Sequence, residues 1–137
     1  MKFELLEHPA DIGFRALGST LEELFANCAN ALVAIILDPS KIQITGEVAL
    51  EATGGEYESL LVNFLNEVLY YVDGKGIALR RFDIRHLDPE QIRCVAGGEP
   101  RNPEKHPPRV VVKAVTYHQL KVALEETGWV AEVYVDV

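Results

Sequence analysis

Long apolar runs are missing from this 137-residue sequence. The longest, Ala31–Leu37, covers one or two helical turns, whereas a membrane-spanning helix needs about 20 apolar residues. The first residues, Met1–Glu4, lack the apolar core of a secretory signal, and the acidic Glu4 and Glu7 argue against a transit peptide. These absences predict a soluble, cytoplasmic protein with no membrane partner.

Cysteines are few and the common catalytic motifs are absent. Only Cys28 and Cys94 occur, each in an apolar pattern typical of a small buried side chain, so neither a disulfide nor a zinc site is supported. The four histidines lack zinc-protease spacing, and no G-x-S-x-G motif or P-loop is present. The sequence therefore does not support nucleophilic catalysis or a phosphate-binding loop.

Basic residues are outnumbered, which gives a net charge of −8 and disfavours nucleic-acid binding by the whole surface. The balance reverses between Lys75 and Lys121, where ten of the 13 basic residues face five acidic ones, for a net charge of +5. The rest of the chain carries 16 acidic and three basic residues, net −13. Either the fold presents one acidic and one basic region, or the charges are scattered over a solvated surface.

Two helices are predicted from apolar residues at helical spacing. Ser19 and Glu22 match a capping box, and the stripe that follows runs to Ile36 before Asp38-Pro39. A second stripe covers 57–72, and Gly74 and Gly76 end it. With hydrophobic residues at 48% of the chain, both helices can contribute to a core.

β-Rich segments surround the two helices and are separated by Gly, Pro and Asp turn signals. The predicted strands are Lys2–Glu7, Ile12–Leu17, Lys41–Thr53, Ile77–Leu87, Ile92–Ala96, Val110–Tyr117, Lys121–Glu125 and Trp129–Val135. The Gly and Pro content of Gly97–Pro108 predicts an irregular segment. The sequence thus predicts a single α+β domain over 1–137, in which two amphipathic helices pack on mixed or antiparallel β-sheets of undetermined strand order.

Acidic groups at the two ends of the chain suggest a cation site. Asp11 follows Pro9 in a predicted turn, and Asp136 precedes Val137, whose main-chain carboxylate adds further oxygen donors. Each acid alone would be interpreted as a cap or a solvated surface residue. If the last strand lies beside the first turn, three carboxylates converge and repel one another unless a cation neutralises them. Such all-oxygen ligation favours Ca²⁺, Mg²⁺ or Mn²⁺ over zinc.

The segment 112–118 mixes polar side chains with β-forming residues. In a regular strand, Lys113, Val115 and Tyr117 would share one face, with Thr116 and His118 on the other. A purely structural interpretation puts Lys113 in solvent, Tyr117 in a half-buried packing site and His118 in a hydrogen bond. The residues alone leave this alternative open.

Four segments resemble the archease family over nearly the full length of the chain. They are HPADIGFRALGSTLEELF at 8–25, LLVNFLNEVLYYVD at 60–73, VKAVTYHQLKV at 112–122 and the terminal VDV. Family members often carry Thr at the position of Pro9 and commonly end in Asp-Ile, so Val137 is a departure that retains the terminal carboxylate.

The resemblance implies a small α+β protein that activates the RtcB-type tRNA-splicing ligase and meets tRNA only through that ligase. It would be a non-catalytic cofactor protein that promotes GTP- and metal-dependent guanylylation of the ligase, permits multiple turnover and broadens nucleotide use. The family's calcium-binding positions map onto Asp11, Asp136 and Val137. Lys113, with Tyr117 and His118 of the same segment, is assigned to activation and partner contact.

Two functions of other classes remain as alternatives. One is a metal-dependent phosphoesterase or nuclease, in which the carboxylates hold Mg²⁺ or Mn²⁺ and His118 acts as a base. The other is a general chaperone or RNA-binding module that uses the basic middle region. Cleavage of RNA without a ligase would favour the first, and salt-dependent binding of tRNA without a ligase would favour the second.

Overall fold

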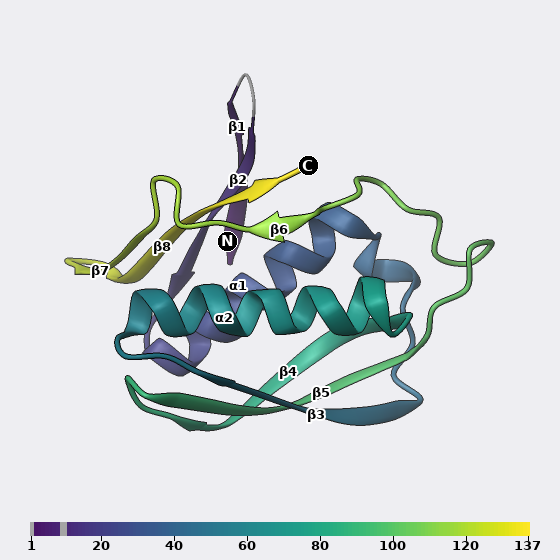
Figure 1. Ribbon diagram of the computed structural model, residues 1–137, viewed down its shortest axis with the longest axis horizontal. Helices are drawn as coiled ribbons and strands as arrows, with labels where there is room; N and C mark the ends of the chain where they lie inside the picture. Colours follow the sequence, from purple (N-terminus) through teal and green to yellow (C-terminus); the bar gives the residue numbers. More distant parts are fainter. Residues whose placement is uncertain (1, 9–10) are drawn as a thin grey trace.

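The computed structural model describes residues 2–8 and 11–137, with only the backbone of Glu7, His8 and Asp11. Its elements form three layers, with both helices lying between two antiparallel β-sheets (Figure 1). The predicted fold class, an α+β domain with two helices packed on antiparallel sheets, is confirmed. Within the described ranges, no helix is long and apolar enough to cross a membrane.

The first helix, α1 (Leu21–Ile36), contacts β2 of one sheet and β4 of the other. A helix in a middle layer has no solvent face over most of its length, which explains why its carboxyl-terminal half is the longest apolar run of the sequence. The second helix, α2 (Tyr57–Leu69), continues into a π-helical turn, η2 (Tyr70–Gly74). The predicted extent of this second helix is therefore confirmed.

The start of α1 differs from the predicted capping box of Ser19 with Glu22. Thr20 is the N-cap, and its hydroxyl accepts a hydrogen bond from the Glu23 backbone N–H at 3.1 Å. The Glu23 carboxylate in turn accepts hydrogen bonds from Ser19, at 3.0 Å from its hydroxyl and 3.4 Å from its N–H. The Ser19–Glu22 prediction is wrong by one residue because Ser and Thr stand side by side and either can cap.

One sheet, here called the terminal sheet, contains both ends of the chain. Its strands are β1 (Phe3–His8), β2 (Asp11–Gly18), β8 (Gly128–Asp136), β6 (Ala114–Val115) and β7 (Lys121–Glu125). The order is β1-β2-β8, and β6 and β7 both pair with the far edge of β8. The carboxyl-terminal strand therefore lies next to the amino-terminal hairpin.

The other sheet, here called the central sheet, has the order β3-β5-β4. Its strands are β3 (Gly46–Thr53), β5 (Gln91–Pro100) and β4 (Ile77–Leu87). The strand predicted from Lys41 begins only at Gly46, because Pro39–Lys41 forms a 3₁₀ turn, η1, and only then does the chain join the sheet.

Two glycines explain why β5 runs further than predicted. The sequence predicts that Gly97 and Gly98 lie in an irregular segment, yet both are buried and paired within the sheet. A Cβ atom on Gly98 would overlap the backbone carbonyl oxygen of Ala78 in β4. Here glycine permits close approach of two strands rather than a turn, so the prediction of irregular structure over 97–100 is wrong.

The core fills the two interfaces between the helices and the sheets. Phe14 of β2, Phe25 of α1 and Phe64 of α2 are fully buried, and the rings of Phe25 and Phe64 lie 6.2 Å apart. Cys28 and Cys94 are free and buried, as predicted. Burial raises the pKa of both thiols, that of Cys94 to about 12, so neither provides a reactive thiolate.

A buried carboxylate network fixes the loop between β5 and β6. Glu99 accepts hydrogen bonds from the Gln43 backbone N–H at 2.8 Å and from the Lys105 ammonium and the His106 ring at 2.9 Å each. His106 is 1% exposed, and its Nδ1 accepts the Asn102 N–H at 2.9 Å. Nε2 therefore carries the proton that His106 donates to Glu99. These contacts hold a loop that leads directly to Lys113.

This network should make folding stability sensitive to acid. The Gln43 backbone N–H and then Lys105 lower the pKa of Glu99 from 4.5 to about 2. A lowered folded-state pKa stabilises the fold above about pH 4.5, and the contribution is lost as the pH falls toward 2. Urea unfolding across this window should show a smaller pH dependence for Glu99→Gln than for the wild type. The exposed loop variant Glu104→Gln should keep the wild-type dependence, and equal curves for wild type and Glu99→Gln would contradict the assignment.

Candidate functional site

The backbone brings the two predicted acidic ends to the same place. In the antiparallel ladder between β2 and β8, Ile12 pairs with Val135. Asp11 precedes Ile12 and Asp136 follows Val135, so the two aspartates occupy the same end of this ladder. The condition set by the sequence, a last strand beside the first turn, is met. Asp136 is exposed, while the side chain of Asp11 lies outside the described residues.

A third segment reaches the same end of the terminal sheet. Ala114 of β6 pairs with Asp136, and the Lys113 backbone N–H donates to the Asp136 carbonyl oxygen at 2.7 Å. The Lys113 side chain is exposed, and Val137 is 41% exposed. Three parts of the chain that are distant in sequence thus place Lys113 beside the acidic terminus.

The segment around Lys113 is less regular than predicted. β6 contains only two residues, and Lys113 and Tyr117 are exposed while Val115 between them is buried. The predicted strand 110–117, with Lys113, Val115 and Tyr117 on one face, is therefore wrong. The chain leaves the ladder where Gln119 adopts a positive φ of 50° and the Leu120 N–H donates back to the Tyr117 carbonyl oxygen.

An aromatic pair lies close to the acidic end. The rings of His118 and Tyr134 meet edge to face, with centroids 6.2 Å apart. Tyr134 pairs across the ladder with Gly13, where a Cβ atom would lie 2.7 Å from two Tyr134 ring carbons. Sequence reasoning missed Tyr134 and Gly13. A glycine inside a strand was the available signal, because it often marks a position where a ligand or another part of the protein approaches the backbone closely.

The donor set at the chain ends fits a hard cation. Asp136 and Val137 offer carboxylate and carbonyl oxygens, which Ca²⁺ and Mg²⁺ prefer. Among the described side chains, no three His, Cys, Asp or Glu residues lie close enough to hold a metal, and Asp11 falls outside that set. The three-carboxylate site therefore stays a prediction that the backbone geometry permits.

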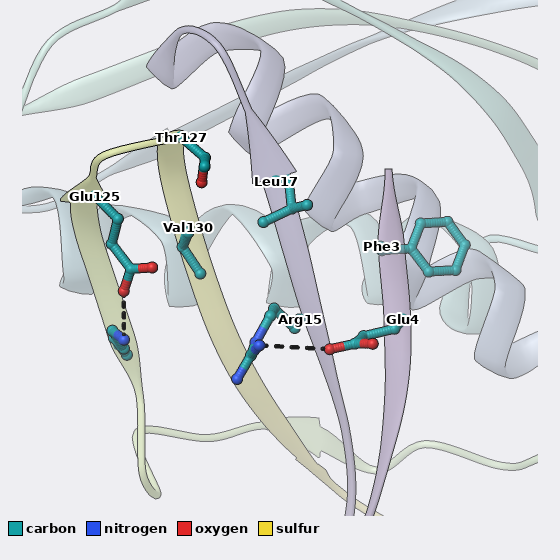
Figure 2. A pocket seen from close by; sticks show the side chains of 8 residues that line it. Phe3, Glu4, Arg15, Leu17, Glu125, Thr127 and Val130 are labelled. Atoms are coloured by element: carbon teal, nitrogen blue, oxygen red, sulfur yellow. Dashed lines mark hydrogen bonds and ion pairs between the residues drawn. The ribbon is translucent and has the colours of Figure 1, made fainter. Parts of the chain in front are cut away.

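A hollow of about 310 Å³ opens at the opposite end of the terminal sheet (Figure 2). Its charged groups already pair with each other: Arg15 lies 3.6 Å from Glu4, and Lys121 lies 2.7 Å from Glu125. Exposed pairs of this kind compensate charge and leave little attraction for an ionic ligand. The hollow is therefore a weaker candidate for the functional site than the acidic end.

Several basic residues of the stretch Lys75–Lys121 lie next to acidic side chains in the described part of the chain. Within residues 2–8 and 11–137, five of its basic residues form ion pairs with described acids, some from distant segments: Arg81 with Glu47 and Asp83, Arg101 with Asp73, Lys105 with Glu99, Arg109 with Asp38, and Lys121 with Glu125. This distribution supports the interpretation of scattered, locally compensated charge.

Comparison with known proteins identifies the family. The model of the Archease protein family matches residues 3–137. The chain belongs to the archease family. It is 42% identical to the protein archease of Methanosarcina acetivorans over 142 aligned positions, which cover 99% of this chain and 96% of the relative. It is 41% identical to the protein archease of Pyrococcus furiosus, with 99% of each chain covered.

A solved structure shares this archease fold. The solution structure of Methanobacterium thermoautotrophicum protein 1598 superposes with a TM-score of 0.81 at 31% sequence identity, covering 99% of each chain. The family resemblance drawn from the sequence is thereby confirmed.

Proposed function

We propose that this archease activates an RtcB-type tRNA-splicing ligase, promoting guanylylation of the ligase and its repeated turnover, and that it is not itself an enzyme. The observation that carries the proposal is the convergence of Asp11, Asp136 and Lys113 at one end of the terminal sheet. These are the positions that the archease resemblance assigns to metal binding and activation. The partner is the ligase, and tRNA is met only through it.

In this proposal, Asp11, Asp136 and the Val137 carboxylate hold a divalent cation of the Ca²⁺ type, with Mg²⁺ or Mn²⁺ as alternatives. When bound, the cation offsets the repulsion among the carboxylates and provides positive charge toward phosphate oxygens. The chain positions its carboxylates through the β2–β8 ladder, whose hydrogen bonds fix the register of both ends. An activator needs such a preorganised group more than it needs an enclosed pocket.

Lys113 has a separate role in the proposal. Its side chain is exposed, and its backbone is tied to Asp136, so the ammonium group can contact a phosphate or an acidic group of the ligase beside the carboxylates. Tyr117, 57% exposed, and His118 follow in the same segment and extend the proposed contact surface.

The position of the acidic end favours insertion into a partner. β1 and β2 extend away from the helix layer, and the carboxyl-terminal strand runs beside them (Figure 1). A projecting edge of this kind can reach a metal- and phosphate-containing cleft of a larger enzyme, whereas a flat sheet face cannot. This geometry supports an accessory protein over a self-contained catalyst.

The decisive assay adds the purified protein to an RtcB-type ligase with broken tRNA in excess. We expect guanylylated ligase to accumulate faster and ligation to continue beyond one turnover. The rival phosphoesterase, with His118 as base, requires RNA cleavage by the protein alone. Cleavage without the ligase, together with no effect on ligation, would overturn the proposal.

A further inference from the structure

Asn66 on α2 holds the segment that carries Lys113. Its side-chain nitrogen donates to the Val115 carbonyl oxygen at 3.1 Å, and its side-chain oxygen accepts the Val115 N–H at 2.9 Å. α2 lies alongside β6 in the fold (Figure 1). One side chain thus satisfies both backbone polar groups of a single residue.

This pairing replaces a missing strand. On its other side, the β6 region bonds to β8 through the Lys113 N–H to Asp136 and the Thr116 N–H to Tyr134, at 2.7 and 3.1 Å. In an antiparallel ladder neighbouring residues direct their N–H and carbonyl groups to opposite sides, so Val115, next to Thr116, directs its groups to the side away from β8. For Val115, that side faces α2, and the Asn66 amide takes the place of the absent neighbour.

We propose that Asn66 is a positioning residue for the archease site, fixing Lys113 and the acidic terminus relative to each other. This inference rests on the proposed function, because it concerns the same site. Fixing Val115 sets the register of β6 on β8, and that register places Lys113 beside Asp136. A fixed register keeps the carboxylates of the acidic end and the Lys113 ammonium group in one relative position, so both can contact a partner at the same time.

The chemistry of the contact requires an amide. The asparagine amide supplies both donor N–H groups and an acceptor oxygen, whereas an ionised aspartate supplies only acceptors and repels the Val115 carbonyl. Val115 is 4% exposed, so in the intact protein its backbone groups depend on Asn66 rather than on water. However, Asn66 and Lys113 line the same open hollow of about 430 Å³, which admits water. The Asn66→Ala substitution should therefore loosen the segment around Val115 without unfolding the domain.

Asn63 provides a matched control on the same helix. It lies one turn earlier and donates to the Thr53 carbonyl oxygen of β3 at 2.7 Å, which belongs to the central sheet. Asn63→Ala removes a side-chain hydrogen bond from the same helix but touches no part of β6. A loss of Ca²⁺ affinity or ligase stimulation that both variants share would come from a change in α2. A loss seen only in Asn66→Ala would come from the lost contact with β6.

The test combines hydrogen exchange, Ca²⁺ calorimetry and ligase assays on the full chain. In Asn66→Ala we expect the Val115 amide to exchange at least about tenfold faster, since its hydrogen-bond partner is lost. Ca²⁺ affinity and ligase stimulation should each fall by about threefold or more, because coupled groups lose their fixed geometry. Asn63→Ala should match the wild type in all three measurements, and Asn66→Asp should fall between the wild type and Asn66→Ala in Val115 exchange.

Wild-type protection of Val115, or unchanged Ca²⁺ affinity and stimulation, in folded Asn66→Ala would overturn the inference. If Asn66→Ala fails to fold, Asn66→Asp serves in its place, and wild-type Ca²⁺ affinity and stimulation in that variant would overturn the inference. Asp136→Ala separates the inference from the proposed function. If Asp136→Ala abolishes stimulation and Asn66→Ala does not, only the positioning role fails. If neither variant alters stimulation, the proposed function fails.

Discussion

Replacing Asp136 with alanine is expected to reduce stimulation of multiple-turnover ligation by at least about tenfold. Asp136 is the exposed carboxylate at the shared end of β2, β8 and β6, and its backbone carbonyl accepts the Lys113 N–H. The substitution keeps this backbone bond and removes only the side-chain oxygens. Ligation kinetics with substrate in excess measure the effect, and thermal unfolding checks that the variant is folded.

Glu132 is the matched control for this variant. It lies four residues earlier on β8, so it shares a strand face with Asp136, but its carboxylate is 3.3 Å from the Arg15 guanidinium. Glu132→Ala should retain wild-type stimulation and lose less than about 1 kcal/mol of stability, as for other exposed pairs. Full activation by folded Asp136→Ala, or an equal loss in both variants, would contradict the assignment of the site.

Lys113→Ala is expected to separate activation from metal binding. Stimulation should fall at least about tenfold, while Ca²⁺ affinity stays equal or rises, because removal of a nearby positive charge lowers repulsion of the cation. The backbone link to Asp136 is unaffected, since the Lys113 N–H makes it. Parallel calorimetry and ligation assays measure the two effects on one preparation.

Lys121→Ala controls for the general loss of a lysine from the terminal sheet. Lys121 pairs with Glu125 at the opposite end of that sheet, and Lys121→Ala should keep wild-type Ca²⁺ affinity and ligase stimulation. If Lys113→Ala weakened Ca²⁺ binding and stimulation together, Lys113 would act on the metal site rather than on the ligase. The separate role proposed for it would then be wrong.

The sequence predicted the elements whose hydrophobic periodicity is long and whose ends carry strong breakers. The second helix, ended by Gly74, and the strand Ile77–Leu87 agree with the structure for this reason. The structure of the irregular regions is harder to predict from the sequence. Residues 110–113 contain β-formers, yet the Arg109 N–H donates to the Ile36 carbonyl oxygen of α1, so this segment packs against a helix before it joins the sheet. Tertiary contacts override local propensity there.

The candidate site was only partly predictable. Residue chemistry made Asp11, Asp136 and Val137 candidates, and the archease resemblance assigned them to a metal site. The proximity of the two ends depends on strand order, which a single sequence does not specify. Asn66 lies on an amphipathic helix but outside its buried apolar stripe, and the sequence around it gives no signal of its role, because its partner Val115 is 49 positions away. Contacts of this kind follow only from the arrangement of the layers.

The central claim is that carboxylates from both ends of the chain bind one divalent cation. Calorimetric titration of Ca²⁺ into the wild-type protein, beside a form with a C-terminal amide in place of the Val137 carboxylate, tests it most directly. We predict one site per chain, with affinity at least about tenfold weaker in the amide form because one negative ligand is lost. Absence of Ca²⁺ binding by the wild type, or equal affinity of the two forms, would contradict the account.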